Sequence, residues 1–408
     1  MVVPPPPRHA ELVLCGPRED VLGALPPVPV RSPWWPDVEA VVDAAREAFG
    51  LEIVVLRMLD SELDRPHGGR VTYLAELRDG AMPATAREGL LPWAGTLDEQ
   101  PLRLPWARAG GPAADLAWAE EVLRERRLER VGPAVQVRSW NLSSIWRLPL
   151  GEGLGQAWLK VVPPFFAHEG EMLRRLGAAP VPRLLGHDGG RTLLADIDGE
   201  DQYDAPLPVL QRMVSMLVAL QAEWVDREDE LLRLGLPDWR GPALTASIAS
   251  VVERRRAEVP EATSAALDAF VAGLPARFEA VRSAGVPETL VHGDFHPGNV
   301  RGSAFRLTLL DWGDCGVGHP LLDMPAFLAA IPEEAVATVR AAWVAAWGAA
   351  SPGSAPEEAA RLLSPVAAAR QAVIYQRFVD GIEPVERRHH DADVVEWLER
   401  AARLAGEE

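Results

Sequence analysis

The sequence predicts an α+β protein in which a β-rich part is followed by a largely helical part, and three observations support this fold class. Strand-like apolar runs separated by glycine turns fill residues 134–197. Beyond them, apolar residues recur at helical spacing, as in Leu210, Met213 and Leu217. A smaller mixed pattern of helix and strand precedes both parts. With 408 residues, the chain is long enough for two or three domains.

The first domain is expected to span residues 1–130 as a small α+β accessory unit. Val38, Val41, Val42, Ala45 and Phe49 fit one face of a helix. Apolar runs at 51–56 and 71–77 predict two strands, and a charged helix is expected over 116–130.

The second and third domains are expected at residues 131–200 and 201–408. The second begins with strands over 135–148 and 157–162, followed by a helix over 167–176. The third is helical except near 289–308, where short strands surround a polar loop.

Composition excludes several classes of protein. The chain has 48% hydrophobic and 25% charged residues, as expected of a folded globular protein. Its net charge of −18 opposes binding to nucleic acid or to an anionic membrane surface, but is compatible with a cationic ligand. Cys15 and Cys315 alone build neither a disulfide framework nor a zinc motif. With no signal peptide and no apolar run long enough for a membrane span, a cytoplasmic location is expected.

One polar loop carries the strongest chemical signal. It runs from Val291 to Val300 and reads VHGDFHPGNV, and the segment LLDWGD follows it. Asp294, Asn299 five residues later and Asp311 have the spacing of the kinase catalytic loop and its second metal ligand. A carboxylate can accept the proton of an attacking hydroxyl, and hard oxygen atoms suit Mg²⁺. The pattern therefore predicts phosphoryl transfer from ATP with Mg²⁺.

A cation for the phosphates is expected upstream of this loop. Lys160 lies within the apolar strand AWLKVV, where an unpaired ammonium would be costly. Glu169, at the start of the next predicted helix, is the expected partner, and Glu171 is the competing choice.

These motifs resemble those of the aminoglycoside phosphotransferase and choline kinase family, over about residues 135–404. HGDFHPGN is similar to that family's catalytic loop, and LDWGD to its metal-binding segment. The resemblance implies a bilobal protein-kinase-like fold, with a β-rich N-lobe and a helical C-lobe. It also implies that Asp294 is the catalytic base, that Asn299 and Asp311 bind Mg²⁺, and that Lys160 contacts the ATP phosphates.

By the same resemblance, Ala195 to Ile197 would form the hinge whose backbone meets adenine, and Asp323 would be a buried support for the catalytic loop. The phosphate-covering stretch lacks the glycines of a protein-kinase loop, so Ser143 and Ser144 are expected to take their place. The N-terminal extension is similar in position to the cap of maltokinase-like sugar kinases.

The acceptor is expected to be a hydroxyl of a small molecule, because only 12 positions separate Asp311 from Asp323, too few for a peptide-docking segment. Acidic and polar residues near the C-terminal helices favour an amino sugar or an aminoglycoside-like compound. The candidates for contact with the acceptor are Tyr375, Asp380 and Glu383, with Gln376 and Glu386 beside them.

Other interpretations stay open at this point. One is a neutral-sugar kinase of the maltokinase type. Another is a non-catalytic binding protein that keeps the fold, which the irregular phosphate-covering stretch and the N-terminal extension favour but the intact catalytic motifs oppose. A zinc hydrolase using His292, Asp294 and His296 would leave Lys160 and Asn299 without a role. His292 and His296 are expected to organise the loop, while His389 and His390 are expected to be solvated ahead of a helix capped by Asp391.

Overall fold

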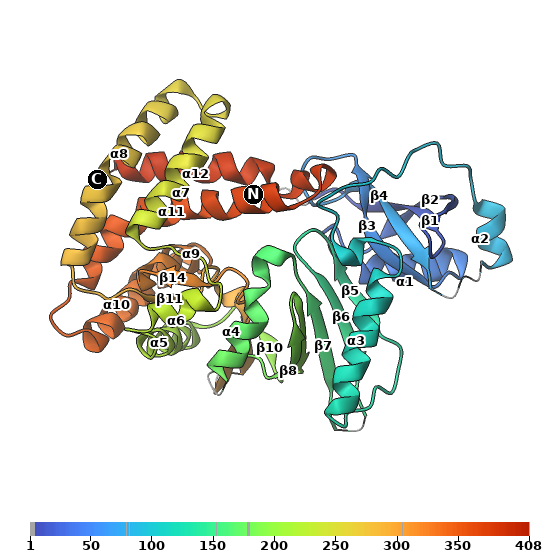
Figure 1. The fold of residues 1–408 in the computed structure, drawn as a ribbon, viewed down its shortest axis with the longest axis horizontal. Helices are drawn as coiled ribbons and strands as arrows, with labels where there is room; N and C mark the ends of the chain where they lie inside the picture. Colours follow the sequence, from blue (N-terminus) through green and yellow to red (C-terminus); the bar gives the residue numbers. More distant parts are fainter. Residues whose placement is uncertain are drawn as a thin grey trace. The chain divides into compact units, whose positions relative to one another are not determined.

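The structure is a computed structural model that describes residues 5–78, 80, 82–151, 153–177, 180–303 and 305–407. It divides into two compact units. The first unit comprises residues 1–167, 184–196 and 378–390, and the second comprises 168–183, 197–377 and 391–408. The predicted α+β architecture, with sheets early and helices late in the chain, is confirmed (Figure 1).

The first unit begins with a four-stranded sheet of order β2-β1-β4-β3. Its strands are β1 (Arg8–Cys15), β2 (Val21–Val30), β3 (Ile53–Ser61) and β4 (Gly69–Leu77). β1 pairs parallel to β4, whereas the other two pairings are antiparallel. The helices of this region are α1 (Glu39–Phe49) and α2 (Ala84–Gly89). Helix α1 and strands β3 and β4 were predicted from the sequence. Strands β1 and β2 were not, because prolines interrupt β2 and follow one another just before β1.

A second, five-stranded antiparallel sheet has the order β5-β6-β7-β9-β8. Its strands are β5 (Val135–Ser139), β6 (Ser144–Pro149), β7 (Gln156–Val161), β8 (Leu184–Asp188) and β9 (Arg191–Ala195). The single strand expected over 135–148 is therefore a hairpin that turns at residues 140–143. Helix α3 (Gly111–Glu125) runs along this sheet (Figure 1).

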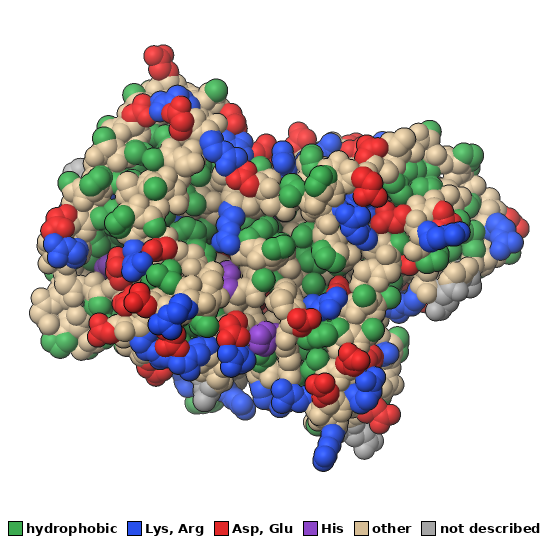
Figure 2. Space-filling model, in the orientation of Figure 1, with side chains coloured by type: hydrophobic (Ala, Val, Ile, Leu, Met, Phe, Trp, Pro, Cys, Tyr) green, Lys and Arg blue, Asp and Glu red, His purple; other side chains and the backbone are tan. Residues whose placement is uncertain are grey.

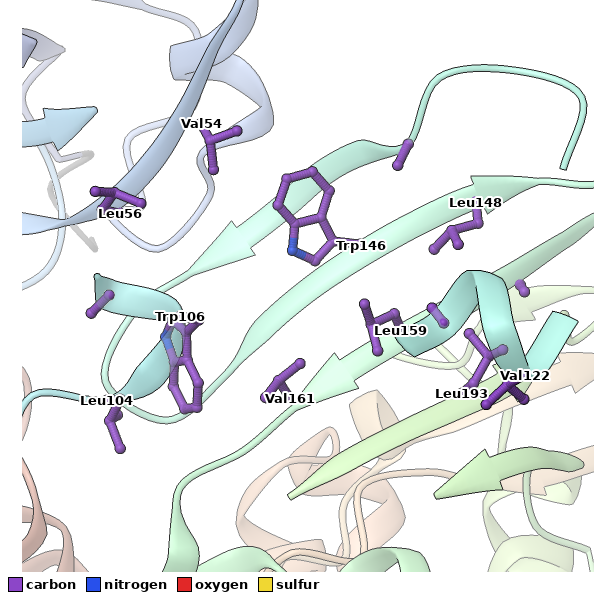
Figure 3. Close-up of a cluster of buried hydrophobic side chains, with 14 of the residues drawn as sticks. Val54, Leu56, Leu104, Trp106, Val122, Trp146, Leu148, Leu159, Val161 and Leu193 are labelled. Carbon is purple, nitrogen blue, oxygen red and sulfur yellow. The ribbon is translucent and has the colours of Figure 1, made fainter. Parts of the chain in front are cut away.

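The two sheets share one apolar core. Val54 and Leu56 of β3 belong to the same buried cluster as Trp146 of β6 and Leu159 of β7. Figure 3 shows these side chains together with Trp106, which lies in the short helix η1 (Pro105–Ala107). Another cluster, with Leu12 and Val55, lies on the opposite face of the N-terminal sheet. The N-terminal region and the five-stranded sheet thus bury apolar surface against each other, which favours their folding as one body.

The segment 378–390 also belongs to the first unit, although it connects two helices of the second. It contains the 3₁₀ segment η6 (Pro384–His389) and is held by buried polar contacts. His390 Nε2 lies 3.0 Å from Asn141 Oδ1, and Arg103 Nη2 lies 3.1 Å from Glu383 Oε2. The expectation that His389 and His390 are solvated is wrong, because both pack against Trp140 and are buried.

The second unit is mainly helical. Its longer helices are α4 (His168–Leu176), α5 (Leu207–Ala222), α7 (Gly241–Arg255), α8 (Glu261–Ser283), α10 (Glu333–Ala350), α11 (Pro356–Gly381) and α12 (Asp391–Gly406). The last turn of α11, after residue 377, belongs to the first unit. The shorter helices are α6 (Glu228–Arg233), η3 (Arg256–Glu258), η4 (Pro297–Asn299), η5 (Pro320–Asp323) and α9 (Met324–Ala329). Helices α7 and α8 run side by side (Figure 1).

Short strands lie within this helical unit. They are β10 (Glu200–Asp201), β11 (Thr289–Val291), β12 (Val300–Ser303), β13 (Arg306–Leu309) and β14 (Gly316–Gly318). β11 pairs with β14, while β10, β12 and β13 form a separate sheet. All pairings are antiparallel.

Surface charge is mixed in sign. On the face drawn in Figure 2, acidic and basic side chains are interspersed. Among the described residues, no helix is both long and apolar enough to cross a membrane.

Candidate active site

The pairing of β11 with β14 brings the two predicted motifs together. Residues 292–299 leave β11 and lead into β12, and residues 310–315 connect β13 to β14. Two hydrogen bonds tie these loops: Leu310 N donates to Asn299 O at 2.8 Å, and the side-chain Nε2 of His292 donates to Leu310 O at 2.9 Å. The structure therefore places Asp294, Asn299 and Asp311 on adjoining loops of one unit.

Asp294 is oriented by Asn299. The Asn299 amide nitrogen Nδ2 donates to the Asp294 carbonyl oxygen at 2.8 Å and to its carboxylate Oδ2 at 2.9 Å. The Asp294 side chain remains 43% exposed, so solvent and a ligand can reach it. A fixed but accessible carboxylate is what general-base catalysis requires.

The two histidines of the loop have structural contacts, as expected. Burial lowers the pKa of His292, and its ring centroid lies 4.5 Å from that of Trp312. His296 Nδ1 accepts a hydrogen bond from Gly298 N at 3.1 Å, while its Nε2 lies 3.6 Å from Asp294 Oδ2. Burial by itself would lower the pKa of His296. The hydrogen bond and the negative charge of Asp294 outweigh the effect of burial, so the pKa of His296 is raised.

Asp323 holds the backbone at the start of the loop 292–299. Its carboxylate accepts hydrogen bonds from His292 N at 2.9 Å, Gly293 N at 2.8 Å and Gln221 Nε2 at 2.9 Å. The side chain is buried, and burial raises its pKa. Hydrogen bonds to a charged acceptor contribute about 1.5–3 kcal/mol each, so this residue can fix the loop backbone as the sequence suggested.

The oxygen chemistry of Asn299 and Asp311 suits Mg²⁺. Because Asn299 Nδ2 is held by Asp294, its Oδ1 is the atom left to bind a cation. Asp311 is exposed and has a left-handed backbone with φ 58°, a strained conformation of the kind that occurs at functional sites. Among the described residues, no group of three or more His, Cys, Asp or Glu could hold a metal. Two protein ligands are nevertheless typical of Mg²⁺, which takes its other oxygens from phosphates and water.

Negative charge accumulates around this site. Partial burial, together with the carboxylates of Asp294 and Asp311, raises the pKa of Asp314 to about 8. The nearby Arg370 and Arg377 oppose that shift without cancelling it. Asp314 belongs to the LLDWGD segment, but no role was predicted for it from the sequence. Its effect depends on three-dimensional proximity, which the spacing alone does not reveal.

Glu169 has a partner that the sequence did not indicate. It is almost completely buried in the first turn of α4, and its Oε1 accepts a hydrogen bond from Trp312 N at 3.2 Å. This contact ties α4 directly to the segment that bears Asp311. Glu171, the competing choice, pairs with Arg174 on its own helix. Lys160 lies on β7 in the first unit, and its pairing with Glu169 stays a prediction.

The other residues expected at the nucleotide lie in two places. Ser143 and Ser144 are buried, and their hydroxyls accept hydrogen bonds from Trp140 Nε1 and Trp146 Nε1. Ala195 ends β9 in the first unit, and the carbonyl of Ile197 accepts a hydrogen bond from Arg301 Nε at 3.0 Å. Their contacts with a nucleotide stay predictions.

The three residues expected to contact the acceptor do not all belong to the same unit. Tyr375 lies on α11 in the second unit, where burial, Asp393 and Asp294 raise the pKa of its hydroxyl. Asp380 and Glu383 belong to the first unit. Because the Glu383 side chain is only 7% exposed and is paired with Arg103, we leave Glu383 out of the proposed acceptor site.

The fold and these paired loops define a kinase-like phosphotransferase. The sequence pattern of the phosphotransferase enzyme family matches residues 153–363, just over half of the chain. The chain belongs to this family, and it is a small-molecule kinase that acts on hydroxyl groups. The family implies a nucleoside triphosphate as co-substrate together with a divalent metal.

Several solved structures are similar to the chain. A macrolide 2'-phosphotransferase type I is 18% identical, with a TM-score of 0.49, and the match covers 69% of this chain and 96% of that one. The macrolide 2'-phosphotransferase of Brachybacterium faecium is 17% identical, with a TM-score of 0.49 and coverage of 70% and 98%. A choline/ethanolamine kinase family protein from Mesorhizobium loti is 14% identical, with a TM-score of 0.46 and coverage of 72% and 99%. None of the curated proteins matches the chain. Identities this low do not identify an acceptor.

Proposed function

We propose that this protein transfers the γ-phosphoryl group of ATP to a hydroxyl of an amino sugar or an aminoglycoside-like compound, with Asp294 as the catalytic base. One observation carries the proposal: Asn299 holds the accessible Asp294 carboxylate, on a loop bonded to the segment that bears Asp311. This combination would supply a proton acceptor and two oxygen ligands for a metal.

The reaction follows from these positions. The acceptor hydroxyl gives its proton to the Asp294 carboxylate while its oxygen attacks the γ-phosphorus. The bond from that phosphorus to the β,γ-bridging oxygen breaks, and ADP leaves. The hydrogen bond from Asn299 keeps Oδ2 in place, which lowers the cost of aligning the base with the hydroxyl.

Asn299 and Asp311 would hold Mg²⁺. When bound, the metal neutralises charge on the phosphates. Lys160, paired with Glu169, would contact the same phosphates, and the backbone from Ala195 to Ile197 would meet the adenine. Ser143 and Ser144 would support the stretch that covers the phosphates through their bonds with two tryptophans.

The acceptor class rests on charge. Burial and the carboxylates of Asp294 and Asp311 disfavour ionisation of Asp314, and Asp393 adds a further carboxylate near Tyr375. Such a site favours a positively charged group, because opposite charges attract most strongly where water is partly excluded. Tyr375 and Asp380 are the side chains that we expect on the acceptor's path.

A phosphate-transfer screen with ATP and Mg²⁺ tests this function. Its arms are aminoglycosides, amino sugars, neutral sugars and amino alcohols, and each is repeated with Asp294→Asn protein purified in the same way. We expect transfer to amine-bearing sugars that depends on Asp294. Transfer to neutral sugars alone would favour a maltokinase-type activity, and no transfer in any arm would favour a non-catalytic binding protein.

A further inference from the structure

A buried arginine contacts the backbone immediately before the catalytic aspartate. Arg370 lies on α11 and has no exposed surface. Its Nη2 donates a hydrogen bond to the carbonyl oxygen of Gly293 at 2.7 Å. No sequence pattern singled out Arg370, because 77 residues separate it from Gly293 along the chain.

Both the N–H and the carbonyl oxygen of Gly293 form hydrogen bonds with buried side chains. Its N–H donates to Asp323 Oδ1 at 2.8 Å, and its carbonyl oxygen accepts from Arg370. The residue has a φ of 93°, and a Cβ atom there would lie 2.0 Å from the carbonyl oxygen of Asp314. The peptide that leads into Asp294 is therefore fixed by an anion on one side and a cation on the other.

Stability alone does not explain this arginine. Two of its nitrogens, Nε and Nη1, are buried and have no hydrogen-bond partner among the described residues. Burial lowers the pKa of Arg370, while Asp323, Asp314 and Asp294 oppose that shift. Burial of a guanidinium is costly even when it is paired, and apolar side chains often replace buried ion pairs without loss of stability.

We propose that Arg370 is a positioning residue for phosphoryl transfer: by holding the Gly293 carbonyl and balancing the nearby carboxylates, it keeps Asp294 in its reactive orientation. The proposal rests on the proposed function of Asp294. It makes Arg370 part of the reaction machinery although it does not touch the substrate. A residue of this kind affects the turnover number more than the binding of substrates.

The test compares Arg370→Met, which removes the charge and the bond, with Arg370→Lys, which keeps the charge. Arg57→Met is the matched control, because Arg57 is also buried and donates to a backbone carbonyl, that of Ala107, at 2.6 Å. We expect Arg370→Met to lower kcat by about 10- to 100-fold, the range for losing a hydrogen bond with a charged partner. The KM for the nucleotide should change less than about threefold. Arg370→Lys should recover part of kcat, and Arg57→Met should leave it unchanged.

Amide hydrogen exchange supplies a readout that needs no acceptor. Exchange in the peptide spanning 292–299 should become faster in Arg370→Met and stay unchanged in Arg57→Met. An unchanged kcat and unchanged exchange in a folded Arg370→Met protein would overturn the proposal. If Arg370→Met fails to fold, full activity of a folded Arg370→Gln protein would overturn it equally. The wild-type protein could transfer no phosphate while exchange in 292–299 is still faster in Arg370→Met. In that case Arg370 does hold the loop, and the proposed function fails.

Discussion

The amide nitrogen of Asn299 donates to both the carbonyl oxygen and the carboxylate of Asp294, at 2.8 and 2.9 Å. One side chain thus fixes the backbone and the carboxylate of the proposed base. Because the same side chain is a proposed ligand of Mg²⁺, metal binding and alignment of the base are physically connected. The five-residue spacing that first indicated a kinase site is the spacing that lets this contact form.

Replacing Asp311 by asparagine should remove Mg²⁺-dependent nucleotide binding. The change deletes the charge that would face the metal, while asparagine tolerates the left-handed backbone at this position. Isothermal titration calorimetry with Mg-ATP measures the effect, with Asp226→Asn as the control because Asp226 has a similar φ of 62°. Equal affinity in Asp311→Asn and the wild type would exclude Asp311 as a ligand.

Gly293→Ala should lower phosphate transfer through steric conflict in the loop that bears Asp294. The new Cβ would lie 2.0 Å from Asp314 O, which forces one of the two loops to move. A displacement of about 1 Å at the base can cost about 100-fold in rate. Gly235→Ala is the control, since Gly235 has a similar φ of 89° but no atom within 4 Å of the added Cβ. Similar kcat values for the two variants would show that the close approach does not matter.

Leu56→Ala should weaken the five-stranded sheet as well as the N-terminal sheet. Leu56 is buried in the cluster that both sheets share, and a buried Leu→Ala change costs about 2–5 kcal/mol. Native-state hydrogen exchange in β6 and β7 measures the effect. Leu12→Ala is the control, because Leu12 is equally buried but lies in the other cluster. If exchange in β6 and β7 is the same in both variants, the shared core does not couple the sheets.

The contribution of the buried histidines to stability should fall as pH falls from about 6.5 towards 4. Burial lowers the pKa of His390 to about 3, so the folded state stays neutral there while the unfolded chain takes up a proton. The unfolded state binds more protons in this window, and each such histidine therefore makes stability rise with pH by about 1.4 kcal/mol per unit. Burial lowers the pKa of His168 to about 4 and of His319 to about 3, which adds to the slope.

Urea unfolding at pH 7 and pH 5 checks this dependence. His390→Gln keeps a donor for Asn141 but removes one titrating group, so its stability should fall less between the two pH values than that of the wild type. Identical pH dependence in the two proteins would contradict the assignment of a neutral, buried His390.

The sequence was most informative where chemistry depends on short spacing. Asp294, Asn299 and His296 lie within six residues, so their contacts follow from one loop. The link between Asp294 and Asp311 required only that two neighbouring strands pair, as β11 and β14 do. The class of site was therefore predictable, along with the α+β architecture.

Contacts between distant residues were not predictable from one sequence. Arg370 reaches Gly293, and Glu169 reaches Trp312, across 77 and 143 residues. Glu383 was predicted to contact the acceptor, but it is buried and paired with Arg103, which lies 280 residues away. Such pairs depend on tertiary packing, for which hydrophobic periodicity gives no signal.

The rate of phosphate transfer by Asp294→Asn tests the central claim most directly. Asparagine keeps the size of the side chain and an oxygen for the bond from Asn299, but it cannot accept the proton. With the best acceptor from the screen, turnover should fall at least about 100-fold, while Mg-ATP affinity measured by calorimetry stays close to the wild type. Turnover close to that of the wild type would contradict the assignment of Asp294 as the catalytic base.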